Sequence, residues 1–124
     1  MGGYQIELTP QGDTATAALY EEGDGRGFLA QQGQIVRRLN NNGSQLLGTI
    51  NDSIPTILKG VGEWNSFHVI ARGSQIIIIV NGHMSAMVID EDYSNRATEG
   101  LLGMQMHVGG PFEINFRNIY YKQL

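Results

Sequence analysis

Gln105 and His107 are the side chains of this sequence best suited to do chemistry together. They alternate with Met104 and Met106, so both point to one face of a predicted strand that runs into the Gly-Gly-Pro segment at 109–111. Histidine gains or loses a proton near neutral pH, and the amide of glutamine both donates and accepts hydrogen bonds. The pair therefore predicts a general acid/base beside a polar-ligand contact; two residues on a solvated strand face are the alternative.

Gln5 and Glu7 repeat this spacing near the start of the chain, where they alternate with Tyr4, Ile6 and Leu8. A carboxylate beside an amide gives a second proton-transfer candidate and a hydrogen-bonding neighbour. A solvated strand face is again the alternative.

Tyr20 and Arg26 flank the glycine-rich residues 23–27 and could supply an aromatic surface and a charge at the rim of a pocket. The alternative is a solvated hairpin loop.

His68, His83 and Trp64 are weaker candidates. The alternation around His68 and the turn before His83 favour surface positions for both. Trp64 could stack on a sugar ring, although a single tryptophan between Gly62 and Phe67 more often lies in a core.

The sequence lacks the motifs of several common kinds of catalytic and cofactor-binding site. It has no Cys, no phosphate-binding Gly-Lys motif, no nucleophile elbow and no pair of His at helical spacing. Three scattered His give no metal-ligand spacing, so we expect neither a metal nor another cofactor. Ordinary glycosidases need two carboxylates at a fixed separation, and the sequence alone does not bring any two of its glutamates together.

Composition excludes several classes of protein. A chain of 124 residues makes one domain, residues 1–124, and its net charge of −4 with 8 scattered basic residues argues against nucleic-acid binding. The longest apolar run, residues 76–80, is far too short to span a membrane, and the first residues do not resemble a signal peptide.

The elements that must position these residues are predicted to be strands. Turn signals recur about every ten residues, a spacing typical of an all-β sandwich or barrel. Apolar and polar residues alternate between these turns, as in half-buried strands, over residues 4–8, 66–71, 104–108 and 112–117.

Three further segments carry local predictions. Residues 75–80 form a β-branched run that enters Asn81-Gly82, which predicts an inner strand and a two-residue hairpin turn. Residues 29–39 could be helical on periodicity, but Gly33 in their middle favours a strand. Residues 53–59 could form one short turn of helix after Pro55 and are otherwise expected to be a loop.

The order and spacing of several motifs resemble the 3-keto-disaccharide hydrolase domain family. The motifs are Gly62-Glu63-Trp64-Asn65, Ala71-Arg72-Gly73, Val80-Asn81-Gly82, residues 100–111 (GLLGMQMHVGGP) and Phe116-Arg117-Asn118-Ile119, with similarity to earlier family strands at residues 3–7 and 16–27. The resemblance implies an all-β, concanavalin A-like jelly-roll sandwich of antiparallel strands. It also implies a concave face that binds a carbohydrate.

The resemblance further implies cleavage of glycosides already oxidised to a ketone at C3. His107 and Glu7 would then be the catalytic candidates, Gln5 and Gln105 would bind sugar oxygens, and Tyr20 and Arg26 would lie at the rim. Many relatives have Glu where this chain has Gln5, which weakens the case for catalysis. Export to the periplasm or cell surface is common among relatives.

The chain matches the last two-thirds of the family domain, so we expect its N-terminal strands to be missing. An opened sheet would leave a strand at residues 3–8 or 112–122 with unpaired backbone groups, and such an edge invites an edge-to-edge homodimer. Three functional hypotheses follow: a hydrolase or lyase, a non-catalytic carbohydrate-binding module, and an inactive remnant.

Overall fold

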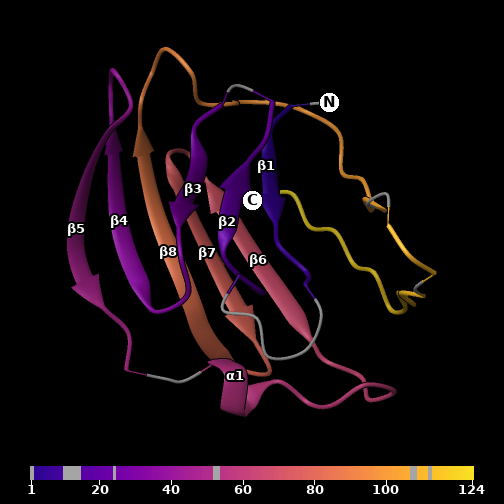
Figure 1. Ribbon diagram of the computed structural model, residues 1–124. Helices are drawn as coiled ribbons and strands as arrows, with labels where there is room; N and C mark the ends of the chain where they lie inside the picture. Colours follow the sequence, from indigo (N-terminus) through magenta and orange to yellow (C-terminus); the bar gives the residue numbers. More distant parts are fainter. Residues whose placement is uncertain (1, 10–14, 24, 52–53, 107–108, 112) are drawn as a thin grey trace.

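The computed structural model describes residues 2–9, 15–23, 25–51, 54–106, 109–111 and 113–124. Its strands form two sheets that pack face to face as an all-β sandwich (Figure 1). The small sheet has the order β1-β2-β3, with β1 at Tyr4–Ile6, β2 at Leu19–Glu21 and β3 at Gly27–Ala30. The large sheet has the order β5-β4-β8-β7-β6, with β4 at Gln34–Leu39, β5 at Gly43–Thr49, β6 at Phe67–Arg72, β7 at Gln75–Val80 and β8 at His83–Glu91.

The predicted all-β sandwich is confirmed, with one correction to its strand directions. Every described pair of neighbouring strands is antiparallel except β4 and β8, which run parallel. Tight hairpins force adjacent strands to be antiparallel, whereas β4 and β8 are joined through β5, β6 and β7 and are free of that constraint.

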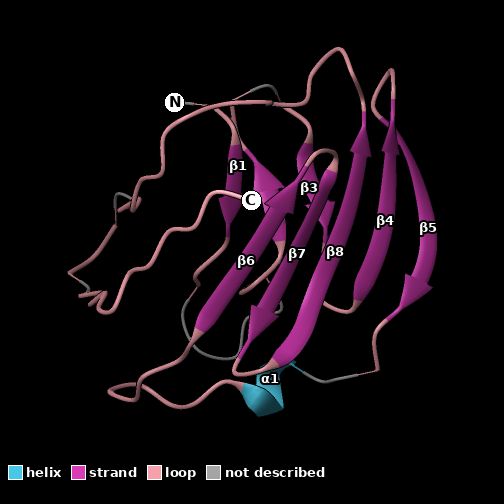
Figure 2. Ribbon diagram, turned by 180° about the vertical axis from the view of Figure 1, so that it is seen from behind, coloured by secondary structure: helices cyan, strands magenta, loops and turns pink. Residues whose placement is uncertain are grey.

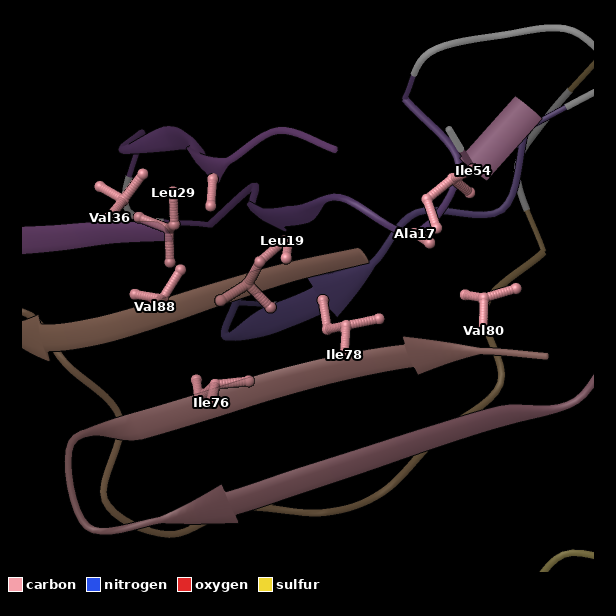
Figure 3. Packing of buried hydrophobic residues seen from close by; sticks show 11 residues of the cluster. Ala17, Leu19, Leu29, Val36, Ile54, Ile76, Ile78, Val80 and Val88 are labelled. Carbon is pink, nitrogen blue, oxygen red and sulfur yellow. The ribbon is translucent and has the colours of Figure 1, made fainter. Parts of the chain in front are cut away.

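The core lies between the two sheets (Figure 3). Leu19 of β2 and Leu29 of β3 pack from the small sheet toward Ile78 of β7 and Val88 of β8, and all four side chains are buried. Because side chains alternate along a strand, the residues before and after each of these four point away from the core. Burial of these apolar groups is the main force that joins the sheets.

β7 confirms the prediction of an inner strand, since it lies between β6 and β8. Ile76, Ile78 and Val80 are buried on one face, while the intervening side chains are half-buried. Asn81 and Gly82 connect β7 to β8 with φ of 49° and 85°, the left-handed backbone that a two-residue hairpin turn of this type requires.

The ambiguous segment 29–39 is extended, as predicted, but it is divided between the two sheets. A turn at Gln32-Gly33 separates β3 from β4, and Gly33 has a φ of 77° that side-chain-bearing residues rarely adopt. A short helix also forms in the expected segment, but it includes Pro55 and does not follow it: α1 spans Ile54–Ile57 and buries Ile54 against the core.

The C-terminal segment departs from its prediction. Residues 104–108 and 112–117 were expected to be strands, yet the described residues between 97 and 124 contain no strand. Apart from the half-buried Ile114, the large apolar side chains described in this range are exposed, with Leu101 fully accessible and Tyr120 at 89%. Alternating apolar residues form a strand only when another strand accepts their backbone hydrogen bonds. This segment loops out from the sandwich and its end returns toward β1, but it joins neither sheet (Figures 1 and 2).

β6 is also less buried than its alternation predicts. Phe67 and Val69 share a face with the buried residues of β7, but 36% and 42% of their surfaces remain accessible. No side chain of β6 belongs to the core cluster of the described residues. β6 is therefore an uncovered edge of the large sheet (Figure 2).

Candidate functional site

The outer face of the small sheet brings together three of the predicted site residues. Leu19 and Glu21 are buried on β2, so Tyr20 between them points away from the core. Gln5 lies directly opposite Tyr20 in the register of β1 and β2, and opposite residues in an antiparallel pair share a face. Phe28 of β3 continues this face, with its ring edge-to-face to Tyr20 at 5.0 Å between centroids.

Glu7 joins the same face just beyond the end of β1. Its backbone nitrogen donates to Ala18 O at 3.1 Å and its carbonyl accepts from Ala17 N at 2.8 Å, so the chain stays beside the small sheet. The Gln5 amide donates to the Glu7 carboxylate, with 2.6 Å between Nε2 and Oε1. The predicted pairing of Gln5 with Glu7 is therefore present as a direct hydrogen bond that orients the carboxylate.

A large hollow of about 2990 Å³ lies beside this pair. Gln5 and Glu7 line it from the small sheet, residues 66–73 from β6 and its flanks, and Gln105 from the C-terminal segment. Most pockets for small ligands measure roughly 300–1,000 Å³, so a single sugar would fill only part of this space. The hollow is an open groove along the side of the sandwich.

Trp64 also lines the hollow, and it does not lie in the core as the sequence favoured. Its side chain is 42% exposed, and the guanidinium of Arg117 lies 3.8 Å from its ring centroid. The loop that carries it is fixed by Asn65, whose Oδ1 accepts from Lys59 N and Asn81 Nδ2 at 2.8 Å each. The face of this indole that Arg117 does not cover is suited to stack on a sugar ring.

Arg26 does not lie at an exposed rim, so that expectation was wrong. Its side chain is 3% exposed and donates to both Glu21 and Asp90, with Nη1 of Arg26 2.9 Å from Oδ2 of Asp90. Asp92 lies 3.9 Å from the same nitrogen, and one of its buried oxygens has no hydrogen-bond partner. The guanidinium therefore holds a buried acidic cluster together beneath the candidate site.

Tyr4 completes this buried cluster, and sequence reasoning missed its role. Its hydroxyl donates to Asp90 Oδ2 at 2.6 Å and so ties β1 to β8. Burial, followed by the hydrogen bond to Asp90, raises the pKa of Tyr4 to about 12. The hydrogen bonds from Arg26 to Glu21 contribute most to raising the already high pKa of Arg26.

The alternation of residues along β1 and β2 was the one sequence pattern that could have predicted part of this cluster. Tyr4 and Glu21 have opposite parity to Gln5 and Tyr20, which places them on the inner face. No such signal existed for Asp90, because its partners lie 64 and 86 residues away in the chain.

The two histidines among the described residues lie on different strands of the large sheet. His68 and His83 are exposed on β6 and at the start of β8, which confirms the surface positions predicted for them. His107 lies outside the described residues, and its predicted partner Gln105 is exposed on the irregular C-terminal segment. Within the described ranges no group of three or more acidic or histidine side chains is arranged to hold a metal ion.

The described part of the chain has no helix long and apolar enough to cross a membrane. A family model described as "3-keto-alpha-glucoside-1,2-lyase-like domain" matches residues 1–122. No curated protein and no solved structure matches the chain.

Proposed function

The chain belongs to the 3-keto-disaccharide hydrolase (3-keto-alpha-glucoside-1,2-lyase-like) domain family, and we propose that it cleaves 3-keto-glycosides bound in the hollow beside β1. The observation that carries the proposal is the hydrogen-bonded pair of Gln5 and Glu7, because it places an oriented carboxylate on the wall of that hollow.

The proposed chemistry depends on the ketone of the substrate. A ketone at C3 acidifies the hydrogen on C2, so a carboxylate can remove that proton as a general base. The electron pair left on C2 forms a double bond to C1 as the bond from C1 to the aglycone oxygen breaks. Addition of water, with the hydroxyl at C1 and a proton at C2, then gives the free 3-keto sugar.

Each predicted site residue has a role in this scheme. Glu7 is the proposed base, and Gln5 holds its carboxylate in place while its amide oxygen accepts from a sugar hydroxyl. His107 is proposed to protonate the leaving aglycone oxygen, and Gln105 to hydrogen-bond the sugar.

The aromatic residues would supply apolar surface, with Trp64 in the hollow and Tyr20 on the adjoining face. Arg26 would contribute indirectly, since it holds β2 in place through Glu21 while Tyr20 faces the ligand.

A non-catalytic carbohydrate-binding function is the second candidate. Gln5 stands where many relatives have a carboxylate, which leaves Glu7 as the single acid of the described pair. The exposed Trp64 and the breadth of the groove favour binding of an extended saccharide. Binding of this kind needs stacking and hydrogen bonds but no proton transfer.

Incubation of the purified chain with a 3-keto-glucoside in D₂O tests both candidates. If Glu7 is the base, aglycone is released and deuterium appears at C2 of the sugar. Glu7→Gln, which keeps the size and hydrogen-bonding capacity of the side chain, should lower both rates by at least about 10²-fold, the usual contribution of a general base.

Glu99→Gln is the matched control, since this exposed glutamate is not among the residues that line the hollow and should leave both rates unchanged. Release that survives Glu7→Gln would remove Glu7 from the mechanism. Saturable binding without release by the wild-type chain would support the carbohydrate-binding module, and neither binding nor release would indicate an inactive remnant.

A further inference from the structure

The two sheets expose four edge strands, and three of them carry features that discourage pairing with another chain. β1 and β3 are only three and four residues long. β5 is longer, but Leu47 is an extra residue in its pairing with β4 and so forms a bulge. Short strands and bulges are the usual means by which proteins block sheet edges.

β6 lacks these protections. Its six residues pair with β7 without a break in register, and the sequence Phe-His-Val-Ile-Ala-Arg contains no proline, no glycine and no acidic residue. Phe67 and Val69 are exposed beside the edge. Among the described strands only β7 pairs with β6, so one side of its backbone is available.

The free backbone groups of β6 belong to alternate residues. Asn81 N donates to Ser66 O at 3.0 Å, which makes Ser66 and Asn81 a hydrogen-bonded pair. In an antiparallel ladder such pairs recur every second residue, so His68, Ile70 and Arg72 direct their backbone groups toward β7. The N–H and C=O groups of Phe67, Val69 and Ala71 therefore point to the free edge.

We propose that a second copy of the chain pairs with this edge, β6 to β6 and antiparallel, around a two-fold axis perpendicular to the large sheet. With this symmetry, the core-facing side of β6 is on the same side of the joined sheet in both copies. Residues that oppose each other across the new pair share a face, so odd-numbered residues must oppose odd-numbered residues. One register places Val69 opposite its counterpart and Phe67 opposite Ala71. These three residues are the ones whose backbone groups are free.

The side chains fit the same register. Phe67 faces the small Ala71, the β-branched Val69 faces another Val69, and His68 faces the apolar Ile70 across the two-fold axis. Arg72, the one permanently charged residue of β6, lies outside these pairs, so no like charges are directly opposed. A shift by two residues, which would place Ile70 on the axis, would bring His68 opposite Arg72 and is less favourable.

Pairing in this way would join the two candidate sites. The hollow of each copy is lined by residues 66–73, which include the whole length of β6. Because the proposed axis preserves faces, the two hollows would lie side by side across the joined strands. This proposal does not depend on the proposed enzymatic activity and can be tested without a substrate.

Charge substitution at Val69 is the sharpest test, because this residue meets itself at the axis. Size-exclusion chromatography with light scattering at high micromolar concentration should give the wild-type chain about twice its 13.6 kDa mass. Val69→Lys and Val69→Glu should each be monomers, since each opposes two like charges. An equimolar mixture of the two should recover the doubled mass.

Leu47→Lys on the bulged edge of β5 is the matched control, and it should keep the doubled mass. Val69→Pro is a second probe, because it removes an N–H that does not bond to β7; it should give a folded monomer with an unchanged circular dichroism spectrum. A monomeric wild-type chain, as expected if its own residues 113–121 cover the edge, would overturn the proposal. So would a mixture of Lys and Glu variants that fails to associate.

Discussion

Arg26 shows how one buried residue can organise both sheets. Its guanidinium contacts Glu21 on β2 and Asp90 on β8, and Tyr4 on β1 donates to the same aspartate. A planar guanidinium offers several donors at fixed angles, so a single arginine can satisfy two carboxylates at once. The inner faces of β1, β2 and β8 are therefore connected by charge as well as by apolar contact.

Removal of this cation should destabilise the fold. Arg26→Met keeps most of the side-chain volume but leaves the carboxylates of Glu21 and Asp90 buried without their cationic partner, which typically costs about 3–5 kcal/mol. Urea unfolding followed by circular dichroism measures the change in the free energy of unfolding.

Arg37→Met provides the comparison, because the ion pair of Arg37 with Glu91 has the same chemistry, but the arginine side chain is 43% exposed. Exposed pairs contribute at most about 1 kcal/mol. Equal losses from the two substitutions would mean that the Arg26 cluster is not a major source of stability.

Tyr4 should make stability sensitive to alkaline pH. Burial and the hydrogen bond to Asp90 raise its pKa from 10.0 in the unfolded chain to about 12 in the fold, so folding favours the neutral phenol. This stabilisation is complete below pH 10 and is lost as the pH rises toward 12. Tyr4→Phe should therefore reduce the fall in unfolding free energy over that range.

Tyr120→Phe, at an 89% exposed position, should leave the alkaline fall as it is in the wild-type chain. An identical pH profile for Tyr4→Phe and the wild type would contradict the assignment. Urea unfolding at several pH values between 9 and 12 provides the data.

At the scale of elements, the hairpin of β7 and β8 depends on two residues with left-handed backbone. Asn81 also donates from its side chain to Ile57 O at 3.0 Å and to Asn65 Oδ1 at 2.8 Å. The turn thereby fixes both the register of the central strands and the loop that presents Trp64. A local change here should affect the hairpin and the candidate site together.

Gly82→Ala should destabilise the protein by roughly 1–2 kcal/mol, because an L-residue with a β-carbon is strained in the left-handed region. The φ of Gly82 is 85°, and an added β-carbon would meet no atom within 4 Å, so the effect is conformational and not steric. Gly100→Ala is the control, since Gly100 has equal space and no left-handed φ. Thermal unfolding should show a lower Tm for Gly82→Ala alone.

At the scale of the whole molecule, the sandwich depends on a few side chains that reach across the interface. Ile78 lies on the central part of β7, is 1% exposed and belongs to the cluster formed with the small sheet. Ile78→Ala should cost about 2–5 kcal/mol, because it removes buried methyl groups and leaves a cavity.

Val69→Ala is the matched change on the neighbouring strand. Val69 pairs with Ile78 in the register but is 42% exposed, so its truncation should cost far less in the monomer. Urea unfolding at low concentration separates this monomer effect from any association. Similar costs at both positions would mean that the small sheet contributes little to the burial of Ile78.

Much of the candidate site followed from local patterns. The alternation of Gln5 with Tyr4 and Ile6 predicted a strand with a polar face, and the hydrogen bond to Glu7 lies on that face. Asn81-Gly82 predicted its turn because the conformational preferences of these residues act over one or two positions. Such features depend on the backbone and on nearest neighbours, so the sequence determines them without the rest of the fold.

Other features depended on contacts between distant residues. The burial of Arg26, the exposure of Trp64 and the absence of strands from the described residues beyond Glu91 were not predicted. Alternation of polar and apolar residues predicts which side chains share a face of a strand. It does not predict which face another element covers, or whether the edge of another strand accepts the hydrogen bonds of its backbone. Contacts between distant segments determine these features, because covering a face or pairing an edge requires a second segment that the local sequence does not specify.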